Sequence, residues 1–172
     1  AELDALTDVI IVDTGAGISD SVLEFLVASG EVLLVTTPEP TSITDSYSLL
    51  KALYRHPRFQ ADFTKVKMVA NRTSNIKEGQ ILFDKLNAVV TRYLKIPMTY
   101  LGCVPQDPQV MQAVMQQIPV SIQNPGAKSS QAYQRIAERL CEKEEEQQPR
   151  RGMAAFFSHI IGTRNGAIKQ PK

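Results

Sequence analysis

Four short segments that resemble strands divide this sequence, and each segment stops at polar or conformationally restricted residues. They cover residues 9–12, 31–37, 65–71 and 98–104. The continuous apolar run over 9–12, which is mostly β-branched, and the run over 31–37 are typical of strands that are buried on both faces of a sheet. Because stretches with helix signals separate these segments, the pattern predicts an α/β fold, with a parallel sheet covered by helices on both faces.

The predicted helices follow from capping residues and from apolar side chains at helical spacing. Helices are expected from residue 19 or 20 to 28, from 41 or 42 to 54, from 74 to 94, from 109 to 116, and from 128 to about 144. In the helix over 74–94, the predicted buried stripe comprises Leu82, Leu86, Val89, Val90 and Tyr93. A loop is expected over 119–126.

Composition limits the possible classes of protein. The chain has 172 residues, of which 43% are hydrophobic and 22% charged, and this suits one globular domain. A net charge of +1 gives no overall attraction to nucleic acid or to a membrane. Cys103 and Cys141 lie far apart without metal-ligand spacing, and we interpret them as reduced thiols.

The first apolar run ends in a motif that suits ligand binding. Residues 9–12 are followed by Asp13, and Gly15 and Gly17 come directly after it. Glycine lets the backbone approach a ligand closely, and a carboxylate at a strand end can orient Mg²⁺ or a water molecule. The alternative is a buried strand that simply enters a tight turn.

The other three runs also end in polar or strained residues. These ends are Thr36–Glu39, Asn71–Arg72 and Pro105–Asp107. Ligands of open parallel sheets bind at the carboxyl ends of the strands, so these residues are candidates for one site. An asparagine offers both the donor and the acceptor that the edge of an adenine requires. The alternative is that Asn71 and Asp107 only cap loops.

Four motifs, in this order and spacing, resemble the MinD/ParA family of deviant Walker-A P-loop ATPases. They are Asp-Val-Ile-Ile-Val-Asp-Thr-Gly-Ala-Gly (8–17), Val-Thr-Thr-Pro-Glu-Pro-Thr-Ser-Ile-Thr-Asp-Ser-Tyr (35–47), Val-Ala-Asn-Arg (69–72) and Leu-Gly-Cys-Val-Pro-Gln-Asp-Pro (101–108). Within the family, the sequence is most similar to the flagellar site-determining subgroup (FlhG, also called FleN or YlxH). The resemblance covers residues 1–145 and the tail.

The resemblance implies a role for each matching residue. Asp13 would position Mg²⁺ and the attacking water. The residues that would sense the γ-phosphate are Gly15, Ala16 and Gly17. Those that would hold the adenine are Asn71, Arg72, Pro105, Gln106 and Asp107. The face used for ATP-dependent dimerisation, which lies near the nucleotide, would include Thr36, Pro38 and Glu39.

The family's Gly-rich, lysine-bearing phosphate loop has no counterpart in residues 1–172, and the resemblance places it before residue 1. Gly126–Ser129 lacks the upstream glycines and buried strand of a P-loop and is expected to begin a helix. We therefore expect the C-terminal part of an ATPase, which alone does not hydrolyse ATP; ATP, ADP and Mg²⁺ belong to the intact protein. Without the neighbouring strand, we expect altered strand pairing, swapping or dimerisation, or poorly ordered first residues.

The C-terminal residues differ in character from the rest. We divide the chain into an ATPase-like domain (1–145), a linker (146–152), an amphipathic helix (153–162) and a flexible tail (163–172). The apolar stripe of that helix comprises Met153, Phe156, Phe157, Ile160 and Ile161. Flanking arginines and the resemblance favour a membrane-targeting helix. The alternative is docking on its own domain or on a neighbouring chain.

The favoured function is therefore that of a MinD-like ATPase controlling the number and placement of flagella. The resemblance implies a homodimer that is cytoplasmic and peripheral on the inner face of the cell membrane, with flagellar assembly proteins as partners. Alternatives are a MinD-type cell-division-site ATPase and a non-enzymatic interaction module for flagellar or division components. A DNA-partitioning role is disfavoured, because nucleic acid binding requires a basic stripe that the near-neutral charge does not indicate.

Overall fold

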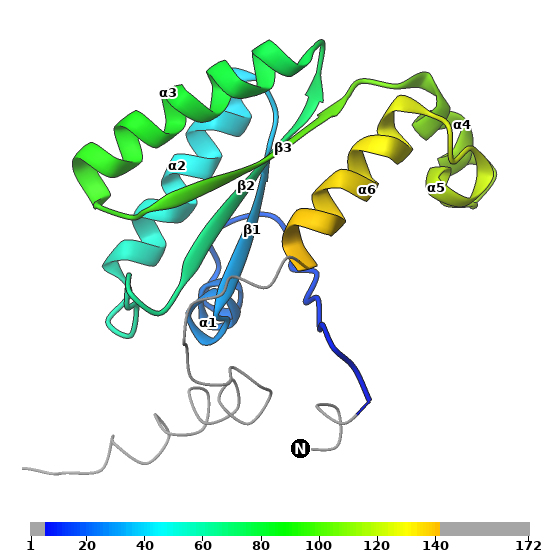
Figure 1. Ribbon diagram of the computed structural model, residues 1–172. Helices are drawn as coiled ribbons and strands as arrows, with labels where there is room; N and C mark the ends of the chain where they lie inside the picture. Colours follow the sequence, from blue (N-terminus) through cyan, green and yellow to red (C-terminus); the bar gives the residue numbers. More distant parts are fainter. Residues whose placement is uncertain (1–5, 142–172) are drawn as a thin grey trace, which may run out of the picture.

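Three parallel strands form the sheet in the computed structural model, which describes residues 6–141 (Figure 1). They are β1 (Glu31–Thr36), β2 (Lys65–Thr73) and β3 (Met98–Pro105), and β2 lies in the middle. Each strand begins within one residue of its predicted start. Three of the four predicted strands, and the parallel sheet, are thereby confirmed.

The helices agree with the sequence pattern to within two residues at every end that the structure describes. They are α1 (Asp20–Ala28), α2 (Pro40–Arg55), α3 (Ile76–Leu94), α4 (Pro108–Met115), α5 (Val120–Gln123) and α6 (Lys128–Cys141). The predicted loop over 119–126 contains the short α5. In Figure 1, α2 and α3 lie together on one face of the sheet, and α6 lies on the other.

The main core lies between the sheet and helices α2 and α3. The alternate residues of β1 and β2 that face these helices are buried, among them Leu34 and Met68. From α3 the core receives Leu82, Leu86, Val90 and Leu94. Val89 and Tyr93 were predicted to be buried, but they are exposed because they lie on the solvent flank of the helix.

The second face of the sheet is covered only in part. Helix α6 packs Ala132 and Ile136 against Val69 of β2 and against Leu101 and Val104 of β3. On β1 the side chains of this face, Leu33 and Val35, are 44% and 53% exposed. Coverage of both faces is therefore confirmed for β2 and β3, but among residues 6–141 no helix covers this face of β1.

The predicted buried strand over residues 9–12 is wrong for this chain. These residues form no strand, and their side chains are 43–81% exposed. A strand needs neighbours for its backbone hydrogen bonds, and in the described part of the chain the sheet ends at β1, which pairs only with β2. The expected re-pairing is also not seen, since β1, β2 and β3 stay parallel neighbours in chain order. Swapping or dimerisation stays a prediction.

None of the helices within residues 6–141 is both long enough and apolar enough to cross a membrane. The predicted domain boundaries at 145, 152 and 162, and the apolar stripe of Met153–Ile161, lie outside the described residues.

Candidate functional site: the carboxyl ends of the strands

The carboxyl ends of the three strands lie level with one another at one edge of the sheet. Thr36 is the register partner of Ala70, and the next residue of β2, Asn71, is the partner of Val104. The following pair on this edge joins Thr73 to Pro105. The structure therefore brings the predicted residues Thr36, Asn71 and Pro105 together, as expected for a shared site at the end of a parallel sheet.

The turn from β1 to α2 is closed by its own side chains. The hydroxyl of Ser42 lies 3.0 Å from that of Thr36 and accepts a 3.0 Å hydrogen bond from the backbone N–H of Thr37. The Thr37 hydroxyl donates to Glu39 at 2.8 Å. Thr36 and Glu39 are thus held in fixed positions at the strand end. The sequence predicted Thr41 or Ser42 as the cap of this helix, but the N-cap is Glu39, and the Ser42 hydroxyl instead closes the turn after β1.

At the end of β2, the structure couples two residues that were assigned different roles. Arg72 has a left-handed backbone (φ 57°), and its Nη1 lies 3.3 Å from Oε1 of Glu39. Both side chains are more than half exposed, so this ion pair contributes about 0–1 kcal/mol. The Asn71 side-chain oxygen accepts a 2.9 Å bond from the Arg72 N–H. The amide nitrogen of Asn71 has no partner among the described residues and could donate to a ligand.

At the end of β3, Asp107 is engaged in structural hydrogen bonds. One of its oxygens accepts from the Gln109 N–H at 3.0 Å, and the other from the N–H and hydroxyl of Ser129, at 3.1 and 2.9 Å. The backbone bonds from Ser129 and Gln109 hold the pKa of Asp107 below its usual value. Asp107 therefore caps α4 and links it to α6, as the capping alternative predicted. The neighbouring Gln106 donates its backbone N–H to the backbone carbonyl of Thr73 at 2.9 Å.

Asp13 does not end a strand, and its side chain is exposed. In Figure 1 the strands end toward the top of the view, whereas the dark-blue segment before α1 lies lower, away from those ends. A Cβ added at Gly15 or Gly17 would meet nothing within 4 Å, so neither glycine serves a close backbone approach here. Gly17 does have a φ of 110°, which favours glycine. The roles of Asp13 and of Gly15–Gly17 toward Mg²⁺ and the γ-phosphate stay predictions.

The residues present fit one side of a nucleotide site and not the whole. Asn71 and Arg72 offer an amide and a guanidinium at the strand ends. Within the described residues there is no cluster of three or more His, Cys, Asp or Glu side chains that could hold a metal ion. Because no Gly-rich phosphate cradle joins these strand ends either, the described residues do not fit a complete Mg²⁺-nucleotide site.

Sequence comparisons place this α/β chain in a family. No family model matches it. It is 38% identical over 154 residues to the antiactivator FleN of Pseudomonas aeruginosa, covering 90% of this chain and 54% of FleN. The flagellum site-determining protein YlxH of Helicobacter pylori is 30% identical over 158 residues, covering 90% of this chain and 52% of YlxH. The chain thus spans about half the length of these curated relatives.

The chain belongs to the MinD/ParA family. FleN and YlxH are among its relatives, as is the chloroplastic septum site-determining MinD homologue of Arabidopsis thaliana, which is 26% identical over 158 residues (87% of this chain, 46% of that protein). A solved structure with some likeness is MinD of Pyrococcus horikoshii in complex with Mg-ADP. It is 21% identical, with a TM-score of 0.47 over 66% of this chain and 42% of that one.

Proposed function

We propose that this chain is the C-terminal part of a MinD-like ATPase that regulates the number and placement of flagella. In the intact protein, ATP promotes a dimer that binds the cell membrane reversibly, and hydrolysis releases it. The observation that carries the proposal is the 38% identity to FleN across 90% of this chain.

The strand ends support the nucleotide part of this proposal. The level ends of β1, β2 and β3 present Thr36, Asn71 and Pro105 on one edge, where α/β proteins of this kind bind ligands. In the proposal, Asn71 contacts the base, and the Arg72–Glu39 ion pair connects that contact to the dimerisation face. The phosphates and Mg²⁺ require a Gly-rich loop supplied by another part of the protein.

The test of the enzymatic proposal compares two proteins. One is the 172-residue chain, and the other is a protein of the relatives' full length that contains it. We expect only the longer protein to hydrolyse ATP and to dimerise with ATP, measured by phosphate release and by light scattering coupled to size exclusion. Asp13→Ala in the longer protein should abolish hydrolysis. A longer protein that neither hydrolyses ATP nor dimerises with it would instead support the non-enzymatic interaction module.

The membrane part rests on the apolar stripe of the C-terminal sequence. Burying five large side chains would contribute roughly 7 kcal/mol before the cost of immobilisation, which suits weak, reversible attachment. Flotation with anionic liposomes should recover the wild-type chain and much less of Phe156→Glu. Equal recovery of the two would end the membrane hypothesis. Cytoplasmic, peripheral localisation is part of the same proposal.

A further inference from the structure

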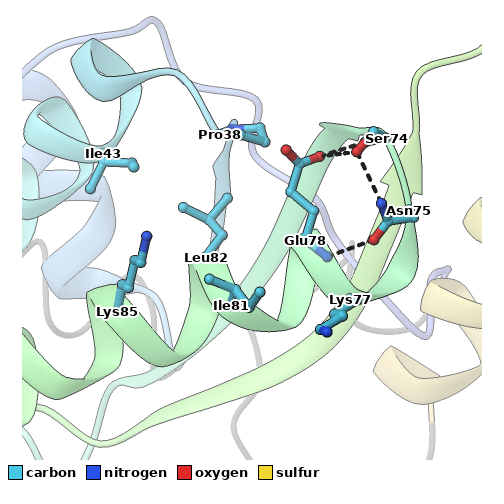
Figure 2. Close-up of a pocket in the computed structure, with 9 residues that line it drawn as sticks. All are labelled: Pro38, Ile43, Ser74, Asn75, Lys77, Glu78, Ile81, Leu82 and Lys85. Atoms are coloured by element: carbon cyan, nitrogen blue, oxygen red, sulfur yellow. Dashed lines mark hydrogen bonds between the residues drawn. The ribbon is translucent and has the colours of Figure 1, made fainter.

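A hollow of about 420 Å³ lies between the start of α2 and the N-terminal half of α3, next to the turns that follow β1 and β2. Its apolar lining comes from Pro38, Ile43, Ile81 and Leu82. Figure 2 shows Ile43 of α2 facing Leu82 and Lys85 of α3 across this space. The volume is within the usual range for sites that bind small molecules, about 300–1,000 Å³.

Cations stand at the border of the hollow without acidic partners. Lys77 and Lys85 both line it, and neither lies within 4 Å of a carboxylate among the described residues. In Figure 2 the Lys85 ammonium reaches toward Ile43. Two cations beside an apolar hollow attract a carboxylate-bearing partner, because a charge near an apolar wall is screened less than one in open water.

The combination of basic and apolar side chains continues along the exposed flank of α3 beyond the hollow. Four residues at a spacing of four, Lys77, Ile81, Lys85 and Val89, lie one above another on the helix, and we call them the α3 ridge. Ile81 and Val89 are 42% and 41% exposed. Basic and apolar side chains therefore alternate along a line that an amphipathic segment could follow.

The acidic side chain at the hollow is already satisfied. Glu78 accepts bonds from the Ser74 N–H at 2.6 Å and from the Ser74 hydroxyl at 2.8 Å. These bonds lower the pKa of Glu78 and keep its carboxylate at the helix start, next to Asn75, which caps the same helix. Glu78 is thus committed to the N-terminus of α3 and does not neutralise Lys85.

We propose that the hollow and the α3 ridge form a docking surface for an acidic amphipathic segment of a partner protein. One apolar side chain of that segment enters the hollow against Ile43 and Leu82, and flanking carboxylates pair with Lys77 and Lys85. This is the helix-in-groove mode of recognition with charges that set the orientation. The surface borders the proposed dimerisation face, because Pro38 lines the hollow, but it uses none of the residues assigned to Mg²⁺, the γ-phosphate or the adenine.

A partner segment fits this surface better than a flat lipid layer does. The hollow can accept a protruding side chain, whereas headgroups would contact only the rim. An occupied hollow would also touch Pro38 and Ser74, which belong to the turns after β1 and β2. The docked segment would therefore lie beside Glu39 in the turn after β1 and close to Arg72 at the end of β2.

The test uses the full 172-residue chain and a defined probe, a fluorescein-labelled 16-residue helical peptide with leucines on one face and glutamates beside them. Its matched twin carries glutamine in place of each glutamate. Measured by fluorescence anisotropy at 50 mM salt, we expect the glutamate probe to bind at least tenfold more tightly than the twin. Lys85→Glu and Ile81→Asp should each weaken binding at least tenfold. Arg135→Glu, an equal change of charge on α6, should change it less than twofold.

Circular dichroism establishes that each variant is folded, and the substituted residues are exposed, so we expect the fold to persist. No binding of the glutamate probe to the wild-type chain, equal binding of the twin, or equal binding by Lys85→Glu would overturn the proposal. Anionic phosphatidylglycerol vesicles form the last arm. If Lys85→Glu reduces vesicle binding while the peptide does not bind, the ridge faces lipid and the proposed partner segment is wrong.

Discussion

At the scale of single residues, Asp107 holds three parts of the molecule together: the end of β3, the start of α4 and the start of α6. We expect Asp107→Ala to lower the melting temperature at pH 7, since the N–H groups of Gln109 and Ser129 lose their acceptor. Asp84→Ala, on the exposed flank of α3, is the control and should change the melting temperature little.

This stabilisation by Asp107 should depend on pH. The folded-state pKa is depressed, so the contribution is fully present above the unfolded pKa of about 3.9 and is lost as the pH falls through the lower folded pKa. The difference in melting temperature between wild type and Asp107→Ala should therefore shrink below about pH 4. A difference that stays constant from pH 7 to pH 2.5 would contradict the ionised cap.

Gly79 sets how closely α3 approaches the sheet. A Cβ at this position would stand 2.6 Å from the Tyr100 hydroxyl and 2.7 Å from Cβ of Cys103, both on β3. We expect Gly79→Ala to lower the free energy of unfolding by about 1–3 kcal/mol, measured by urea denaturation. Gly126→Ala is the control, because its nearest neighbour would be an ordinary contact at 3.6 Å. Equal stability of the two variants would show that α3 can shift without cost.

The limits of prediction at this scale are physical. That Asn71 and Pro105 share an edge follows from local rules, because parallel strands end on the same side of a sheet. The contacts of Ser42 with Thr36 and of Ser129 with Asp107 cannot be predicted from these rules. Several hydroxyl groups are available in the sequence, and the packing of the chain decides which one faces the partner.

At the scale of secondary structure, the side chains on the two faces of β1 should contribute very different amounts to the free energy of unfolding. Leu34 faces the core and is buried, whereas its neighbour Leu33 is 44% exposed. We expect Leu34→Ala to cost about 2–5 kcal/mol of unfolding free energy. Leu33→Ala, the matched control, should cost less than about 1 kcal/mol because it removes little buried surface. Similar losses for both would mean that another element covers the outer face.

The apolar run at residues 9–12 should behave unlike the strands. Its residues are exposed and belong to no strand, whereas Val66–Ala70 lie in the central strand. We expect the amides of 9–12 to exchange with deuterium at nearly unprotected rates and those of 66–70 to be protected by orders of magnitude, measured by NMR. Strong protection of both segments would show that 9–12 pair with a strand, within the chain or in a second copy.

The sequence pattern predicts β1, β2 and β3 well because each is a short segment with apolar residues, bounded by residues that stop strands or begin helices, such as Pro38 and Pro105. The same pattern misjudges residues 9–12. Their composition suits a buried strand, but burial requires a neighbouring strand and a covering helix, and local composition specifies neither.

At the scale of the whole molecule, helices cover one face of the sheet, whereas the other face is covered only in part. Helices α2 and α3 close one side over β1–β3, while the outer face of β1 and the segment before α1 are left exposed (Figure 1). The chain spans about half the length of its curated relatives.

The most direct test of the central claim, that the strand ends form the base-binding side of a nucleotide site, is ADP binding measured by isothermal titration calorimetry. The protein should be one of the relatives' full length that contains this chain. We predict that Asn71→Ala weakens ADP binding at least fivefold, because the base loses a hydrogen bond worth about 1 kcal/mol or more. Asn87→Ala on α3 should bind as the wild type does. Unchanged affinity of Asn71→Ala would contradict the claim.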